Sequence, residues 1–248
     1  MEDDLIEKSV ESLRHSKYTF AFTGAGISVE SGVPPFRGKN GIWSKYDPKV
    51  LDLDYFYANP LEAWKVIREI FYDYFGKAKP NPAHSILGEW EQKGFLKCVV
   101  TQNIDNLHQA GGSKKVYEFH GNAQKMICTK CSYRFPADEV DFDKLPVACP
   151  KCGGLVKPDF VFFGEAIPSD AYAGSLDAAR NADVCIVIGS LGEVMPAAMI
   201  PMEAKRNGAT IIEINPETTN FTNQITDYHL KMGASDAMKI LNDKLFSN

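Results

Sequence analysis

Apolar and polar residues follow two alternating patterns along the chain. Strand-like stretches occupy residues 18–23, 95–105, 116–122, 160–165, 183–190 and 209–215. Several of them are apolar throughout, which is typical of strands buried on both faces of a sheet. Segments with helical spacing of apolar residues or helix-capping residues occupy 3–16, 169–181, 196–207 and 235–245. This alternation predicts an α/β fold with a doubly wound, mainly parallel, Rossmann-like sheet.

Two Asn-Pro pairs predict further helices, because asparagine caps a helix and proline is favoured in its first turn. Asn59-Pro60 predicts a helix to about Phe75, and Asn81-Pro82 predicts the start of another. The region between Pro34 and Lys79 is rich in aromatic residues, which are more often core than ligand contacts. We expect a helical insertion at 35–79, a cysteine-rich module at 124–157, and a sheet domain assembled from 1–34, 80–123 and 158–248.

Charge and hydropathy narrow the classes of function. The net charge of −5 and a pI of about 5.6 disfavour a surface built to bind nucleic acid. No apolar run reaches about 18 residues and the first residues are acidic, so neither a membrane span nor a secretory signal is expected. We therefore predict a cytoplasmic protein, in which paired cysteines are more often metal ligands than disulfides.

The cysteine-rich module holds the most specific local motif. Cys128-x2-Cys131 and Cys149-x2-Cys152 are separated by 17 residues, a spacing typical of a tetrahedral zinc site. Four thiolates leave no open position on the metal, so we predict one structural zinc ion. A nucleic-acid-binding ribbon is the alternative, but residues 125–157 hold only six basic side chains against four acidic ones. Cys98 and Cys185 lie in apolar strands and are expected to be inert.

A glycine-rich turn follows the first strand. Gly24-Ala25-Gly26 lets the backbone turn tightly and approach an anion such as a dinucleotide phosphate, and Arg37 adds a positive charge. Val29 stands where the Rossmann fingerprint has its third glycine, so an ordinary strand-to-helix turn is the alternative. Polar residues also follow the strands near 101–105 and 120–122, where open α/β sheets bind ligands.

Several motifs occur in one order along the chain: Gly24-Ala25-Gly26-Ile27-Ser28, Phe36-Arg37-Gly38, Gln102-Asn103-Ile104-Asp105, His120-Gly121 and the four paired cysteines. Together they resemble the sirtuin family of NAD-dependent protein-lysine deacylases, from about residue 18 to residue 217. The resemblance implies one catalytic unit over 1–248, with NAD and an acetylated-lysine protein meeting between the sheet domain and the smaller parts. The oligomeric state is left open.

The resemblance also implies residue roles. His120 matches the family's base, which withdraws a proton from a ribose hydroxyl after the acyl oxygen has attacked the ribose carbon that carries nicotinamide. Asn103 and Asp105 match residues that hold the ribose and the nicotinamide amide, and they complete the catalytic set. The predicted NAD contacts are these three residues with Gly24, Ala25, Gly26, Ile27, Ser28, Phe36, Arg37, Gln102, Ile104, Gly189, Ser190, Asn215, Glu217 and Ala234.

The substrate-binding segment is implied in the same way. The predicted residues are Val161, Phe162, Phe163, Gly164 and Glu165, with Glu193 and Val194 on the facing segment. An extended peptide would pair between them by β-augmentation, and an apolar tunnel would take the acylated lysine. Such a tunnel would exclude a charged lysine by desolvation.

The chain departs from the family pattern in three places. Pro35 replaces an aspartate that precedes Phe-Arg-Gly in many members, so any role of that carboxylate is absent. Residues 190–195 differ from the common Ser-Ser-Leu-x-Val-x-Pro, which affects peptide preference. The Tyr and Arg pair of desuccinylating members is not found at 71–79, so acetyl or another uncharged acyl group is expected.

His84 and His108 also match family positions, and we interpret both as structural residues satisfied by local hydrogen bonds. Two other functions stay open at this point. One is mono-ADP-ribosyl transfer, which would use the same NAD site with a different acceptor. The other is non-enzymatic sensing of NAD or ADP-ribose, for which loss of His120 or Asp105 would be the mark, and both are present.

Overall fold

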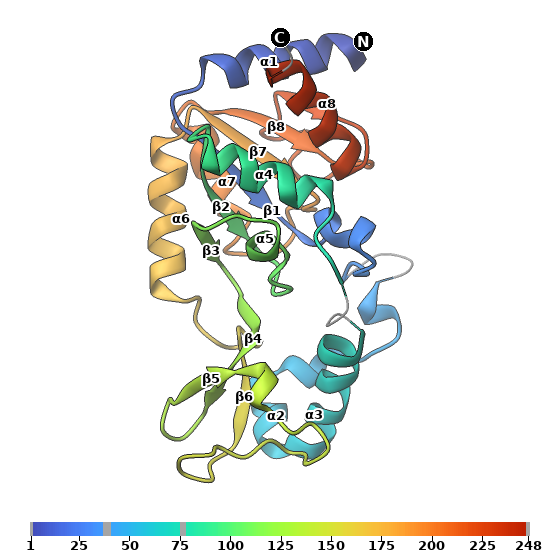
Figure 1. Ribbon diagram of the computed structural model, residues 1–248, viewed down its shortest axis with the longest axis vertical. Helices are drawn as coiled ribbons and strands as arrows, with labels where there is room; N and C mark the ends of the chain where they lie inside the picture. The colour runs from blue at the N-terminus through green and yellow to red at the C-terminus, as the bar shows by residue number, and fades with distance from the viewer. Residues whose placement is uncertain (1, 37–40, 75–77, 247–248) are drawn as a thin grey trace.

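The structure, a computed structural model, describes residues 2–36, 41–74 and 78–246. The elements form two lobes (Figure 1). The small lobe comprises residues 41–74 and 121–165, and the large lobe comprises the other described residues. No helix among the described residues is both long and apolar enough to cross a membrane.

A six-stranded parallel sheet forms the centre of the large lobe. Its strand order is β3 (Val116–Glu118), β2 (Leu96–Thr101), β1 (Thr19–Thr23), β7 (Val184–Ile188), β8 (Thr210–Ile214) and β9 (Tyr228–Leu230). Every neighbouring pair is parallel. The order reverses between β1 and β7, which is the point where doubly wound sheets bind dinucleotides. The predicted Rossmann-like α/β fold is therefore confirmed.

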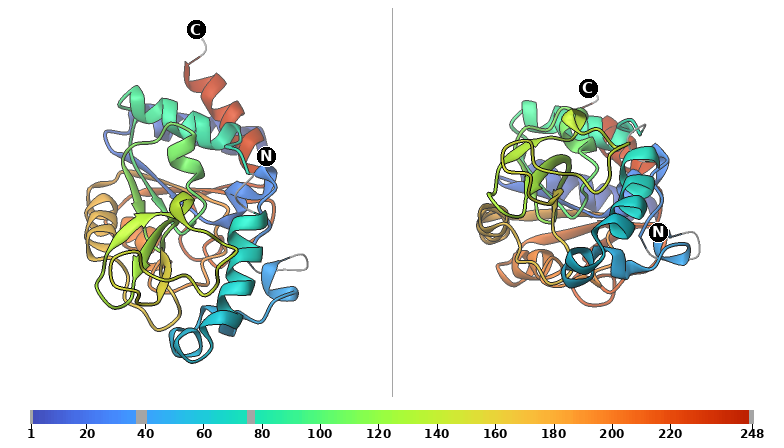
Figure 2. Two further views of the ribbon diagram at one scale, coloured as in Figure 1. Left: turned by 60° about the horizontal axis from the view of Figure 1, so that its bottom comes forward. Right: turned by 90° about the horizontal axis from the view of Figure 1, so that it is seen from below.

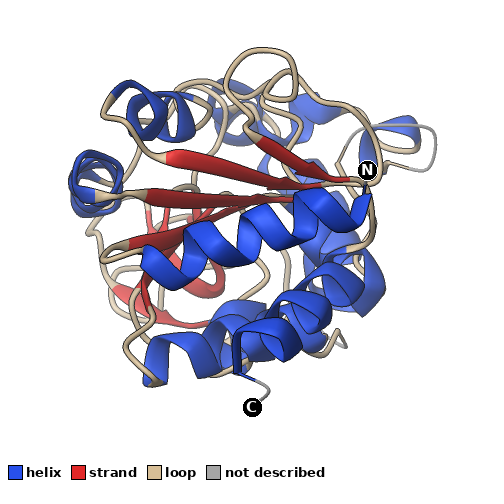
Figure 3. Ribbon diagram, turned by 90° about the horizontal axis from the view of Figure 1, so that it is seen from above, coloured by secondary structure: helices blue, strands red, loops and turns tan. Residues whose placement is uncertain are grey.

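Helices cover both faces of this sheet (Figure 3). On one face lie α1 (Glu2–His15), α4 (Pro82–Gln92) and α8 (Ala234–Phe246), packed on strand residues such as Ala21. On the other lie α6 (Ser169–Asn181) and α7 (Met199–Arg206), packed on Phe20 and Phe22. Because successive side chains of a strand point to opposite faces, a strand covered on both sides is apolar throughout.

The small lobe combines an antiparallel sheet with short helices (Figure 2). Its strand order is β5 (Arg134–Pro136), β4 (Gly121–Cys128) and β6 (Val156–Phe160). The helical part contains the α-helices α2 (Leu53–Ala58) and α3 (Pro60–Ile67), the π-helix Arg68–Tyr74, and the 3-10 turns Ile42–Ser44 and Pro48–Leu51. Side chains from both parts form one buried apolar cluster that includes Trp64, Phe71, Met126 and Phe160.

Two predicted strands end elsewhere than expected. The strand predicted at 160–165 ends at Phe160, because the chain folds back in a turn at Gly164, whose φ is +94°, and Phe163 makes only an isolated bridge to Asp52. The stretch 116–122 splits at His120, since Gly121, with a φ of +77°, redirects the chain into the small lobe.

Two helix predictions also need correction. The helix expected to begin at Pro196 begins at Met199, because a turn closed by the Ala198 N–H to the Val194 oxygen (2.9 Å) comes first. The helix expected from Pro60 to Phe75 is α-helical only to Ile67 and continues as the π-helix to Tyr74. Phe75 lies outside the described residues.

Candidate active site

The glycine turn after β1 lies against the end of β7. The Gly26 N–H donates to the Gly189 oxygen at 2.9 Å, and the Gly24 N–H donates to the Ile188 oxygen at 3.0 Å. A Cβ added at Gly26 would lie 2.5 Å from Gly189 Cα, so the backbones touch without room for a side chain. The turn opens into a 3-10 helix, Ala25–Ser31. It therefore brings bare backbone to the switch point of the sheet, as an anion cradle requires.

The segment after β2 brings polar side chains to the same edge. Asn103 Nδ2 donates to the Gly24 oxygen and to Ser28 Oγ, each at 3.2 Å. The Ser28 hydroxyl donates to Asp105 Oδ2 at 2.7 Å. Burial raises the pKa of Asp105, while the hydrogen bonds from the Leu107 N–H and Ser28 oppose that shift. The glycine turn and the predicted Asn103 and Asp105 are thus brought together.

His120 lies at the turn that follows β3, beside this segment. Its Nδ1 is 3.1 Å from the Gln102 carbonyl oxygen. Because a carbonyl oxygen can only accept, Nδ1 carries the proton and Nε2 keeps its lone pair. Burial lowers the pKa of His120, and the bond to Gln102 opposes this in part. His120 is therefore held as a neutral imidazole with one nitrogen available as a base.

His84 and His108 lie buried in the large lobe, their ring centroids 5.0 Å apart. The Asn81 N–H donates to His84 Nδ1 at 3.3 Å in a capping box at the start of α4, a local hydrogen bond of the kind predicted, and His84 Nε2 lies 3.5 Å from Ser28 Oγ. For His108 the prediction is half wrong. Its Nε2 meets Thr23 Oγ1 at 2.8 Å, but its buried Nδ1 has no hydrogen-bond partner among the described residues.

A small pocket lies at this edge of the large lobe. It is lined by Ala25, Val33, Phe36, Asn103, Ile104 and Asp105. All but Val33 were predicted NAD contacts. Val33 was missed because an apolar residue between a glycine and two prolines carries no chemical signal in the sequence. Arg37 lies outside the described residues.

The remaining predicted NAD contacts follow β7 and β8. Gln102 Nε2 donates to Ser190 Oγ at 2.8 Å, so the ends of β2 and β7 are linked across β1. Asn215 follows β8 and accepts the Glu217 N–H at 3.2 Å. Ala234 is buried at the start of α8, next to Ser235, whose N–H donates to Glu30 of the glycine-turn helix at 3.1 Å. These residues line the carboxyl edge of the sheet on the far side of the switch point.

The predicted substrate residues lie in two irregular segments. Phe163 is 50% exposed and Phe162 is buried. The Val161 N–H donates to the His120 carbonyl oxygen at 2.8 Å, so the first segment is joined directly to the candidate base. The second, with Glu193 and Val194, follows β7 and is not a strand. Peptide pairing between the two segments stays a prediction.

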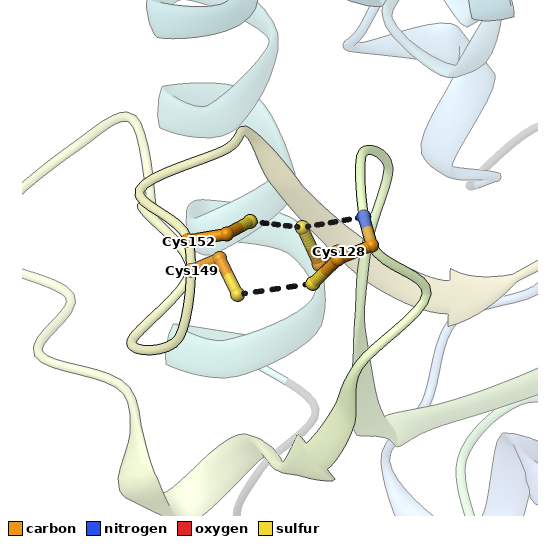
Figure 4. Close-up of side chains that lie close together, drawn as sticks. Cys128, Cys149 and Cys152 are labelled. Atoms are coloured by element: carbon orange, nitrogen blue, oxygen red, sulfur yellow. Dashed lines mark hydrogen bonds between the residues drawn. The ribbon is translucent and has the colours of Figure 1, made fainter.

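The four paired cysteines form a compact cluster in the small lobe (Figure 4). Their sulfur atoms all lie within 4.8 Å of one another. The N–H groups of Lys130 and Cys131 point at Cys128 Sγ, at 3.4 and 3.5 Å. Four convergent sulfur donors suit zinc, which prefers tetrahedral thiolate sites.

The other two cysteines are unrelated to this cluster. Cys98 and Cys185 are buried in β2 and β7, as predicted. Burial raises the pKa of Cys98 to about 12 and that of Cys185 well above its usual value. Both thiols therefore stay protonated near neutral pH, which favours inert packing over chemistry.

Comparison with known proteins adds a family and relatives to this geometry. Residues 24–196 match the profile of the Sir2 family. NAD-dependent protein deacylase 1 of Caldanaerobacter subterraneus subsp. tengcongensis is 43% identical over 235 residues, which is 92% of this chain and 95% of that protein. The NAD-dependent protein deacylase of Pyrococcus furiosus is 43% identical over 244 residues, covering 94% of this chain and 95% of its own.

Solved structures give the same answer at the level of the fold. A mutant Sir2 homologue in complex with ADP-ribose superimposes with a TM-score of 0.91 at 40% identity, covering 96% of each chain. A Sir2 protein with a deacetylated p53 peptide and 3'-O-acetyl ADP-ribose superimposes with a TM-score of 0.90 at 36% identity, covering 96% of this chain and 98% of the other.

Proposed function

Because this chain belongs to the Sir2 family and is an NAD-dependent protein deacylase, we propose that it removes acetyl groups from protein lysines at the site built around His120. The acetyl group is transferred to ADP-ribose, and nicotinamide and the free lysine are released. The observation that supports this site best is the imidazole of His120. Its Nδ1 is fixed by the Gln102 carbonyl, and its Nε2 is left as a base.

The residues present fit NAD. In the glycine turn at 24–26, the N–H groups of Gly24 and Gly26 bond to Ile188 and Gly189, so the pyrophosphate would be held by the Ala25 N–H between them. Asn103 and Asp105 would hold the ribose and the nicotinamide amide, and Asn215 the adenosine ribose. When bound, NAD supplies the ribose carbon that loses nicotinamide and accepts the acyl oxygen. The task of Asn103, Asp105 and Ser28, already joined by hydrogen bonds, is to orient that ribose.

His120 would act as general base toward a ribose hydroxyl. Its lowered pKa keeps it neutral near pH 7, so it can accept a proton without first losing one. A positioned base of this kind contributes about 10² to 10⁴ in rate. Its backbone carbonyl binds the Val161 N–H, so the base and the proposed peptide-binding segment are held in fixed relation.

We propose an acetylated-lysine protein or peptide as the substrate, bound as an extended strand along residues 161–165. A solved relative holds a deacetylated p53 peptide, which supports a peptide mode of binding. An uncharged acyl group is favoured over succinyl, because the Tyr and Arg pair of desuccinylating members is missing.

The four-cysteine cluster would hold one zinc ion. Closed by four thiolates, that ion has no free position for a substrate, so its role would be to stabilise the small lobe. A reducing compartment such as the cytoplasm fits a site that needs free thiolates.

The test uses an acetyl-lysine peptide with NAD, and mass analysis of all products. We expect equal amounts of nicotinamide, deacetylated peptide and acetylated ADP-ribose. His120→Ala should lower kcat/KM by about 10² to 10⁴. His15→Ala is the matched control, since that ring is exposed on α1 and bonds to the Glu11 carbonyl, and it should change neither rate nor melting temperature.

Two results would overturn the proposal. If ADP-ribose becomes attached to the protein acceptor while the acetyl group stays in place, the chain is a mono-ADP-ribosyltransferase. If NAD binds but no nicotinamide appears, the chain is a sensor. A His120→Ala protein with normal activity would remove His120 from the mechanism.

A further inference from the structure

Lys157, on β6, is a buried cation that the mechanism does not use. Its side chain is 7% exposed. The ammonium donates to the carbonyl oxygens of Pro158 and Phe160, at 2.9 and 2.8 Å, and lies 3.0 Å from Glu165 Oε2. All three of its donors are therefore used within the same short stretch of chain. Burial lowers the pKa of Lys157, and Glu165 opposes that shift.

Glu165 uses its carboxylate to close a turn. Its Oε2 accepts the Phe162 N–H at 2.8 Å, and its own N–H donates to the Phe162 oxygen at 3.0 Å. Gly164 lies inside this turn with a φ of +94°. Phe162 is thus tied to Glu165 twice, and Glu165 is tied to Lys157. The side chain of Glu165 points into the protein, which leaves it a supporting role.

The same turn is fixed at its two neighbours. The Val161 N–H bonds to the His120 carbonyl, and the Phe163 N–H bonds to the Leu51 oxygen, each at 2.8 Å. Leu53 donates back to the Phe163 oxygen at 3.2 Å. Among the described residues, the exposed N–H of Gly164 has no acceptor, so it is available to a ligand.

We propose that Lys157 and Glu165 are positioning residues for the acyl-lysine peptide. The ion pair holds residues 161–165 in the shape that exposes the Gly164 N–H and the Phe163 side chain, on a segment that Val161 joins to the His120 carbonyl. This inference rests on the proposed function, because it assumes that the peptide binds along this segment. NAD contacts come from the large lobe, so the pair should affect the peptide and not the nucleotide.

The test measures KM for peptide and for NAD separately in three variants. Lys157→Met should raise the peptide KM about tenfold and leave the NAD KM within about twofold, the pattern of a lost ground-state contact. Glu165→Gln keeps an acceptor for the Phe162 N–H, so the peptide KM should rise only about threefold.

The double variant Lys157→Met with Glu165→Leu separates positioning from stability. Removing both charges leaves no unpaired buried charge, so the melting temperature should recover toward that of the wild type. The acceptor for the Phe162 N–H is still missing, so the peptide KM should stay raised about tenfold. If Lys157→Met alone does not fold, the double variant decides the question.

Lys144→Gln is the matched control. It breaks an ion pair of the same lobe, 2.8 Å from Asp141, and the Lys144 side chain is 84% exposed. Its peptide KM should be that of the wild type. The inference is overturned if the peptide KM recovers together with stability in the double variant, or if the NAD KM rises in parallel. Absence of deacetylation by the wild-type chain would instead defeat the proposed function.

Discussion

The two lobes are stabilised by different means. The large lobe has an apolar cluster on each face of one parallel sheet, with strand residues such as Phe20 and Ala21 facing opposite sides. The small lobe has one apolar cluster shared between its helical part and its three-stranded sheet, together with the four-cysteine cluster. The large lobe is stabilised by a continuous sheet packed on both faces. The small lobe depends on the contacts between its helical part and its sheet and on the four-cysteine cluster.

This difference separates the tasks of the site. Most residues proposed to bind NAD follow the ends of β1, β2, β3, β7 and β8, and the packing of the sheet sets their positions. The segment proposed to bind the peptide belongs to the small lobe and is held by an ion pair and by single hydrogen bonds. Damage to the small lobe should therefore affect peptide use before nucleotide binding.

The largest effect is expected from removing a zinc ligand. Cys128→Ser should abolish zinc binding, lower the melting temperature by about 10 °C and reduce deacetylation about a hundredfold or more, because the metal replaces much of a core in so small a unit. NAD binding should survive. Cys185→Ala, a buried cysteine of β7, is the control and should keep one zinc per chain. Metal analysis and calorimetry check both, and full zinc in Cys128→Ser would contradict the cluster as a metal site.

Gly26→Ala, in the large lobe, is expected to weaken NAD use and to leave peptide use intact. The new Cβ would lie 2.5 Å from Gly189 Cα, so the ends of β1 and β7 must separate. We expect the free energy of unfolding to fall by about 3 kcal/mol and the KM for NAD to rise about tenfold, with the peptide KM unchanged. At Gly94, φ is +72° and no atom lies within 4 Å, so Gly94→Ala should cost only about 1 kcal/mol without affecting NAD. Equal peptide and NAD effects in Gly26→Ala would undo the division of tasks.

Much of the large lobe could be predicted, because its central strands are buried on both faces and read as apolar runs. β9 could not be predicted. It is three residues long, carries His229 in its middle, and takes its place only through pairing with β8, Ile212 opposite Tyr228. The strand ends could be predicted as a site, since parallel strands finish at one edge. That logic located Asn103, Asp105 and His120 before any geometry.

The small lobe was less predictable, except for its cysteines. Lys157 is the clearest case. A lysine in a polar segment is ordinarily exposed, and its burial depends on carbonyl oxygens that point inward only after the chain has folded. The strand expected through Glu165 was wrong for the same reason, because the carboxylate turns back to bind Phe162 and Lys157.

Acid should weaken the large lobe through its buried histidines. All five histidines lie in it, and burial lowers the pKa of His84 from 6.5 to about 4 and that of His108 well below its usual value. The unfolded chain then binds more protons than the folded one between these values, so the free energy of unfolding falls as the pH drops from 6.5 to 4. His84 alone accounts for about 3 kcal/mol, which the raised pKa of Asp105 offsets in part.

Urea unfolding at a series of pH values, with zinc content measured in parallel, checks this prediction. His84→Gln should flatten the slope between pH 6.5 and 4, whereas His15→Gln, on the exposed surface of α1, should leave it unchanged. A slope that is identical in His84→Gln and the wild type would show that His84 is not the titrating group.

The smallest effect compares one substitution in each lobe. Trp64 in the small lobe donates to the carbonyl oxygen of Val156, and Trp90 in the large lobe donates to the side chain of Asn242, both at 2.9 Å. In Trp64→Phe the Val156 oxygen loses its partner inside the core, whereas in Trp90→Phe the half-buried Asn242 can turn toward water. Trp64→Phe should therefore cost about 2 kcal/mol and Trp90→Phe about 1 kcal/mol, measured by urea unfolding. Equal losses of unfolding free energy in the two variants would mean that the Trp64–Val156 hydrogen bond, which links the helical part and the sheet of the small lobe, contributes no more than the Trp90–Asn242 bond.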